Sequence, residues 1–162
     1  MIAFHSVLPE VAEREVRCVR IQTASGLTPN SGLAAGEYAF VEYYCENLKC
    51  DCRRTFVQVI ARPEPNQVLA SINYGWEKES FYRKHMPYDR KAPRQVVQGW
   101  LDPINTQSMH SQELLELFQK FVLDEPYRQR LQQHYQLCRD EIRRRQRQPI
   151  PGLVSPRANP QK

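Results

Sequence analysis

The sequence lacks long apolar runs, and it lacks the motifs that identify common enzyme classes. No stretch approaches the roughly 20 apolar residues of a membrane-spanning helix. The N-terminal residues have neither the basic start nor the sustained apolar core of a signal peptide, so we expect a cytoplasmic protein. There is no glycine-rich phosphate-binding loop, no GxSxG elbow and no HExxH helix. No catalytic activity therefore follows from a motif.

The composition is that of one ordinary globular domain. The 162 residues are 41% hydrophobic and 25% charged, which is enough to build a core without disulfides. We expect a single domain over residues 1–147. Residues 148–162 contain four of the 12 prolines and are expected to form a disordered tail.

The net charge of +5 is concentrated near the end of the chain. From Arg139 onward there are seven cationic and two acidic side chains, whereas residues 1–138 carry 16 charges of each sign. The segment Arg139–Arg147 is therefore a candidate contact for nucleic acid or another polyanion. The interpretation we favour is that cations gather at the C-terminal end of a helix, where the helix dipole is negative.

Sequence patterning predicts a sheet in the first two thirds of the chain. Strands are expected where β-branched and aromatic residues are dense, over residues 15–22, 37–45, 53–62, 67–76 and 95–101. Most of the links are short, which favours antiparallel pairing because a parallel return needs a longer crossover.

Helical periodicity predicts two helices at the C-terminal end. The first has an apolar face made of Leu114, Leu117, Phe118, Phe121 and Val122. The second begins after Asp124 and has an apolar stripe made of Tyr127, Leu131, His134, Tyr135, Cys138 and Ile142. The predicted fold class is α+β, a small antiparallel β-sheet backed by two C-terminal α-helices.

Three of the five cysteines fall within eight residues. Cys45 closes one predicted strand, and Cys50 and Cys52 precede the next, so all three gather at the tip of one hairpin. Clustered thiols in a reducing compartment are typical of a site for a soft metal ion. Zinc (Zn2+) fits best because it takes sulfur among four ligands and needs no redox chemistry. An iron–sulfur cluster and metal-free thiols are the alternatives.

A closed zinc site needs a fourth ligand. His134 and Cys138 lie four residues apart on the apolar stripe of the last helix, so both face the sheet. We predict that His134 is the fourth ligand and completes a Cys3His site, with Cys138 or water as the alternative. Cys18, in the middle of a strand, is expected to be a core residue.

One part of the sequence resembles a known family. The stretch GEYAFVEYYCENLKCDCRR, followed by INYGWEKESFY, LDPINTQS and YRQRLQQHY, resembles uncharacterised bacterial proteins with a Y-x-F-x-E-x-Y-C-x4-C-D-C-R-R signature. The resemblance spans residues 36–138, and its specific part is the CDCRR block. It implies a shared domain and metal binding, and the family has no established activity.

Three functions are compatible with these features. We favour a structural zinc site in a protein of unknown cellular role. An interaction module would use the basic segment together with Tyr74, Trp76, Phe81 and Tyr82, which can stack bases, although a core role is the simpler interpretation of these aromatic residues. A zinc- or thiol-dependent hydrolase would need a metal with three protein ligands and a bound water.

Overall fold

The computed structural model describes residues 1–22, 32–62, 67–105 and 107–147. Its strands are β1 (Ile2–Ala3), β2 (Arg17–Ile21), β3 (Gly36–Tyr44), β4 (Arg54–Arg62), β5 (Val68–Gly75) and β6 (Trp100–Leu101). Its helices are α1 (Phe4–Val7), α2 (Pro9–Glu15), α3 (Glu79–His85), α4 (Ala92–Gln98), α5 (Ser111–Leu117), the π-helical segment η1 (Phe118–Val122) and α6 (Glu125–Arg147). None of these helices is both long and apolar enough to cross a membrane. The tail predicted for residues 148–162 lies outside the described residues.

The described strands form one antiparallel sheet, as predicted. The order is β1-β3-β4-β5-β6, and β2 also pairs with β3. β1 lies opposite Tyr43 and Tyr44, and β2 lies opposite residues 36–40, on the edge of β3 that β4 does not use. Val41 and Glu42 therefore lie in a gap between two edge strands, where the chain leaves the sheet as α1 and α2.

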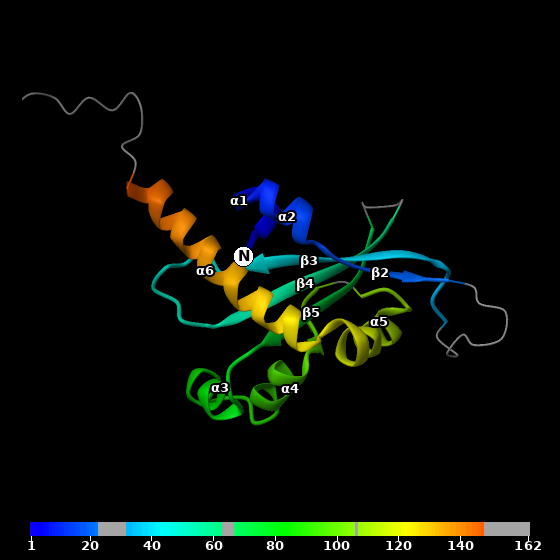
Figure 1. Ribbon diagram of the computed structural model, residues 1–162. Helices are drawn as coiled ribbons and strands as arrows, with labels where there is room; N and C mark the ends of the chain where they lie inside the picture. Colours follow the sequence, from blue (N-terminus) through cyan, green and yellow to red (C-terminus); the bar gives the residue numbers. More distant parts are fainter. Residues whose placement is uncertain (23–31, 63–66, 106, 148–162) are drawn as a thin grey trace, which may run out of the picture.

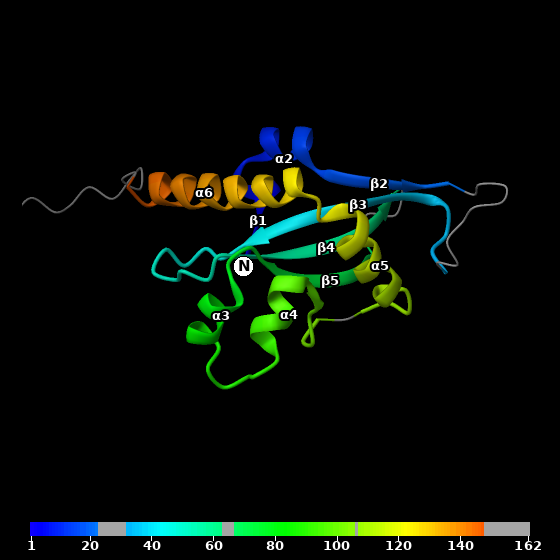
Figure 2. The ribbon, with the colours of Figure 1, turned by 60° about the horizontal axis from the view of Figure 1, so that its bottom comes forward.

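The C-terminal helices cover one face of the sheet. Figure 1 shows α6 crossing the strands diagonally, and Figure 2 shows α3 and α4 together beyond β5. The main core lies between the covered face and the helical segments α5, η1 and α6. Its buried side chains are Tyr38, Phe40, Val57, Val59, Ala70, Ile72, Tyr74, Leu114, Leu115, Phe118, Val122, Leu123, Tyr127 and Leu131. This arrangement confirms the predicted α+β class.

A second buried cluster joins α1 to the C-terminal half of α6. Its members are Phe4, Val7, Tyr44, Tyr135, Cys138 and Ile142. Every residue of the apolar stripe predicted for the last helix is buried. Because the stripe packs into both cores, the rotation of α6 about its axis is fixed, and its C-terminal half lies against the loop between β3 and β4.

Two expectations about local structure are wrong. The strand expected over residues 95–101 is reduced to β6, because residues 92–98 form α4 with Pro93 in the first turn. Gly99 ends that helix with a φ of +84°, which favours glycine. Phe121, expected in the core, is 65% exposed. It lies in the wider π-helical turn, which buries Phe118 and Val122 instead.

Candidate metal centre

Three thiols come together at the tip of the β3–β4 hairpin, as predicted. The Sγ atoms of Cys45, Cys50 and Cys52 all lie within 4.8 Å of one another, and each residue is half-buried. A tetrahedral zinc ion with bonds of about 2.3 Å to sulfur holds two thiolates roughly 3.8 Å apart. The donor set is therefore compatible with a single soft metal ion.

The loop that carries the cysteines turns twice. Cys45 follows β3 directly, and the N–H of Cys50 donates to the carbonyl oxygen of Asn47 (3.0 Å), which closes the first turn. Arg53, between Cys52 and β4, has a φ of +44°, in the left-handed region that residues other than glycine rarely adopt. Such a conformation costs on the order of 1–3 kcal/mol, so the surrounding contacts must hold it.

α3 supports the strained turn at Arg53. The Tyr82 hydroxyl, on a side chain that is 1% exposed, donates to the Arg53 carbonyl oxygen (2.5 Å) and accepts a hydrogen bond from the N–H of Glu77 (3.3 Å). The Tyr82 ring occupies the space that a side chain at position 75 would fill, so Gly75 at the end of β5 admits it. The residue pair Gly75 and Tyr82 thus helps to position the cysteine loop.

Arg139 of α6 holds the loop from the other side. Its guanidinium group donates to the carbonyl oxygens of Leu48 (2.6 Å) and Cys50 (2.8 Å), and it lies 5.3 Å above the centre of the Tyr135 ring. The side chain is 8% exposed. Figure 1 shows the loop beside the C-terminal half of α6. The sequence places Arg139 in a basic segment, and nothing in it signals that the partners of Arg139 are backbone carbonyls 89 and 91 residues away.

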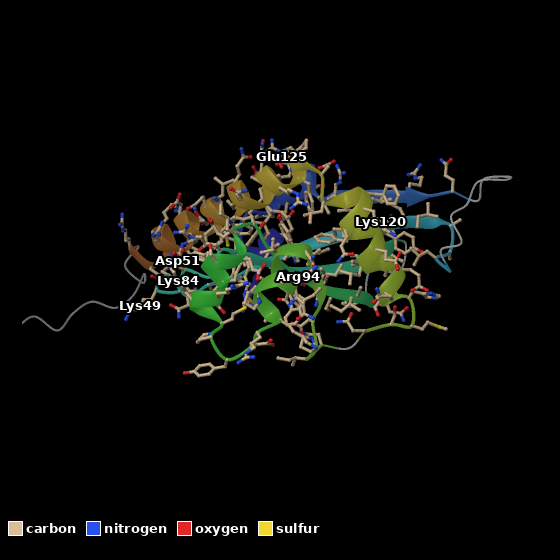
Figure 3. All side chains as sticks on the ribbon, turned by 90° about the horizontal axis from the view of Figure 1, so that it is seen from below. Lys49, Asp51, Lys84, Arg94, Lys120 and Glu125 are labelled. Atoms are coloured by element: carbon tan, nitrogen blue, oxygen red, sulfur yellow. The ribbon has the colours of Figure 1, made fainter. Side chains whose placement is uncertain are left out.

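Arg53, the cation between Cys52 and β4, pairs with two carboxylates. Arg53 donates to Asp51 (2.8 Å) and to Glu77 (3.1 Å), and the hydrogen bond from Arg53 lowers the pKa of the Asp51 carboxyl group. Figure 3 shows Lys49 and Asp51 at the same end of the molecule as Lys84 of α3. Arg53, which flanks the cysteines in the sequence, is thus already neutralised by two carboxylates.

The environment of the Cys52 thiol favours its protonated form. Burial, followed by the neighbouring thiols of Cys50 and Cys45 and opposed by the charge of Arg54, raises its pKa to about 12. A metal ion that binds here must displace this proton. Metal affinity at the site should therefore increase as the pH rises.

His134 lies among carboxylates instead of with the thiols. Its Nδ1 is 2.7 Å from Oε2 of Glu42, its Nε2 is 3.1 Å from Oε2 of Glu15, and its ring stacks on Phe4 at 4.2 Å between centroids. Both ring nitrogens have partners, so the structure does not support His134 as the fourth ligand. The helix does bring His134 to the buried face, as expected, but Glu42 at an inward position of β3 provides the nearer partner.

These two contacts favour the protonated form of the His134 ring. A neutral imidazole donates from one nitrogen only, whereas the protonated ring donates from both. Burial alone would lower the pKa of His134, but the hydrogen bond and charge of Glu42, followed by those of Glu15, outweigh burial and raise it. The Tyr44 hydroxyl donates to the same Glu42 oxygen (2.7 Å) and completes the cluster.

No other histidine or cysteine joins the three thiols. All nine such residues of the chain lie in the described ranges, and the only group able to hold a metal there is the cysteine trio. Cys138, the alternative fourth ligand, is fully buried in the second core, and burial raises its pKa to about 11. Cys18 is half-buried on β2 rather than a full core residue.

A polar cleft of about 560 Å³ lies beside the cysteine loop. Asp51, between two of the cysteines, and Arg139, which holds the loop, both line it, together with Trp76 and Tyr135. The Tyr135 hydroxyl is buried and has no hydrogen-bond partner among the described residues. None of the three clustered cysteines lines this cleft.

Most of the aromatic residues and arginines considered for a nucleic-acid interface make contacts within the protein instead. Tyr74 and Tyr82 are each 1% exposed, so the interpretation of them as core residues is confirmed. On α6, ion pairs link Arg143 to Asp140, and Arg144 and Arg145 to Glu141, at 2.7–2.8 Å. These contacts favour the interpretation of the basic segment as an ordinary helix end.

Comparisons of the chain with protein-family models, with curated proteins and with solved structures found no match in any of the three. The resemblance carried by the CDCRR block therefore stays a prediction.

Proposed function

We propose that the protein binds one zinc ion through Cys45, Cys50 and Cys52. The observation that carries this proposal is the convergence of three thiols within 4.8 Å of one another on a loop held by other elements. Three thiolates suit zinc, which has no preferred d-electron geometry and tolerates a fourth ligand of another type. An iron–sulfur cluster is less well supported, because it is normally held by four cysteines.

The role that we propose for the metal is structural. The ion would link the end of β3 to the start of β4 across a loop that contains a strained residue, Arg53. α3 and α6 hold the same loop through Tyr82 and Arg139. Metal binding would therefore stabilise the place where three elements meet, as binding energy at such a site is also folding energy. Three reduced thiols also agree with a reducing compartment such as the cytoplasm.

The test is metal analysis of the protein purified under reducing conditions without added metal. We expect about one zinc per chain. We expect Cys50→Ser to lose the zinc and to unfold at a lower temperature. If zinc is present at a thousand times its dissociation constant, the loss in the free energy of unfolding should be about 4 kcal/mol. Cys18→Ser, on β2 and outside the cluster, is the matched control and should keep the zinc. A stable, metal-free wild-type protein would refute the proposal, and a brown one would indicate iron.

A hydrolytic zinc site is the second candidate, because the chain gathers only three histidine or cysteine ligands and a cleft lies beside them. In that case the fourth position holds a water whose pKa the metal lowers. Zinc-loaded protein should then hydrolyse activated esters or phosphoesters, and Cys50→Ser should abolish the activity. Equal rates for the wild type and this variant would remove the candidate.

A further inference from the structure

A second cavity, of about 400 Å³, lies between α2 and β3, and none of the three clustered cysteines lines it. Its volume falls in the range of small-molecule sites, roughly 300–1,000 Å³. The cavity exists because β1 and β2 leave a gap on the edge of β3 at Val41 and Glu42. α2 passes over this gap, and a helix cannot fill the place of a missing strand closely.

The surface of the cavity walls is mostly apolar, although six of the 12 lining residues are ionisable. Phe4, Pro9, Val16 and Phe40 are among the apolar lining residues. The buried polar groups are the Glu42 carboxylate and the His134 ring, which are 5% and 2% exposed. Apolar walls around a small number of convergent polar groups are typical of a ligand site rather than of a packing defect.

The charges around the cavity do not balance. Glu42 is buried and Glu15 is 40% exposed, protonated His134 lies between these two carboxylates, and Arg130 pairs with Glu15 at 3.7 Å. Glu13, which is exposed, also lines the cavity and adds a further negative charge. Arg62 is the other cation among the lining residues, and it pairs with Glu37 at 3.3 Å. The three carboxylates therefore exceed the two cations His134 and Arg130 by one charge, which a monovalent cation in the cavity would neutralise.

One oxygen of the Glu42 carboxylate has no aligned donor. Both hydrogen bonds that Glu42 accepts, from Tyr44 and His134, go to Oε2, and its Oε1 accepts none from the described residues. The buried Tyr127 hydroxyl lies near the same carboxylate, and burial followed by Glu42 raises the pKa of Tyr127. At the exposed end, Arg130 approaches Oε2 of Glu15 at 3.7 Å, beyond hydrogen-bond distance.

We propose that this cavity binds a small organic cation, a protonated amine on an apolar body. Its ammonium group lies between Oε1 of Glu42 and the Glu15 carboxylate, and its apolar part packs against Phe4 and Phe40. The ammonium supplies the missing positive charge, and the walls remove the apolar body from water. The site is separate from the proposed zinc centre, so each proposal can be tested independently of the other.

The test compares three probes on the full chain by calorimetry, with the ring signals of His134 followed by NMR. Benzylamine should bind and shift the His134 signals. Benzyl alcohol, of the same shape without the charge, should bind at least about tenfold more weakly, since charge-assisted hydrogen bonds are roughly twice as strong as neutral ones. Benzoate, with the opposite charge, should not bind. Equal binding of benzylamine and benzyl alcohol, or no binding of benzylamine, would overturn the proposal.

Variants on one helix locate the binding. Glu15→Gln, at a side chain that is 40% exposed and so replaceable without unfolding, should weaken benzylamine binding by about fivefold or more. Glu10→Gln, on the same helix but outside the cavity lining, should leave the affinity unchanged. Equal losses in the two variants would show general charge attraction and would contradict a site in the cavity.

Discussion

His134 and Glu42 form an ion pair inside the protein, with Nδ1 and Oε2 2.7 Å apart and side chains that are 2% and 4% exposed. The two residues are 92 positions apart in the sequence, so the pair joins α6 to the middle of β3. Removing two charges from water costs several kcal/mol per ion, and close partners must offset this cost. The surrounding contacts from Glu15, Tyr44 and Phe4 do so.

Removal of the imidazole should strongly destabilise the protein. His134→Ala leaves the Glu42 carboxylate buried without its cation, and we expect a loss of about 3–5 kcal/mol in the free energy of unfolding. His85→Ala, at an exposed histidine on α3, should cost less than about 1 kcal/mol. Urea denaturation measures both values. A double variant, His134→Leu with Glu42→Leu, should recover much of the lost stability. A loss for His134→Ala as small as that for His85→Ala would contradict a stabilising ion pair between His134 and Glu42.

Stability should fall as the pH rises past neutrality. The pKa of His134 is raised in the folded protein above its ordinary value of 6.5. The stabilisation from the imidazolium is therefore fully present below about 6.5 and is lost as the pH rises through the higher folded value. The measurement is the free energy of unfolding against pH for the wild type and for His134→Gln. The difference in the free energy of unfolding between the wild type and His134→Gln should shrink as the pH rises from mildly acidic to mildly alkaline. A constant difference would show that the ring does not change its charge in this range.

Arg139 should support the metal centre without binding the metal. Arg139→Ala removes both hydrogen bonds to the carbonyl oxygens of Leu48 and Cys50. Loss of such a supporting contact typically lowers metal affinity by about 10–100-fold. Arg143→Ala, one turn further along α6 and paired with Asp140, serves as the control. Competition with a zinc chelator measures the affinities, and equal affinities for the two variants would remove Arg139 from the site.

Zinc retention should separate His134 from the cysteines. Because both His134 nitrogens contact carboxylates, His134→Gln should retain about one zinc per chain even though it unfolds more easily. Cys138→Ala should also retain zinc and lose only packing energy, because its side chain lies in the second core. X-ray absorption of the wild type should show three sulfur ligands and one lighter atom. Loss of zinc in folded His134→Gln would restore His134 as the fourth ligand.

Local sequence patterns were enough to predict the sheet and the last helix. The dense β-formers of β3, β4 and β5 and the short links between them determine a meander, because each strand has its partner next to it in the chain. The stripe that contains Leu131 and Ile142 determines the buried face of α6. The same locality predicted the cysteine cluster, since Cys45 and Cys52 flank one hairpin loop and the hairpin alone brings them together.

Contacts between distant parts of the chain decided the rest. The sequence places His134 on the buried face of a helix, but only the packing of α6 across β3 decides that Glu42, and not a metal, meets it. The hydrogen bonds of Arg139 and the support of Arg53 by Tyr82 likewise depend on the tertiary structure. A donor side chain does not reveal in the sequence which distant backbone carbonyl it will contact. The gap between β1 and β2, and with it the cavity under α2, exists only once both strands pair with one edge of β3. The sequence therefore determined which residues form most of the helices and strands and which thiols cluster. The tertiary structure decided which buried charges meet, because ion pairs depend on distances in space that sequence separation does not define.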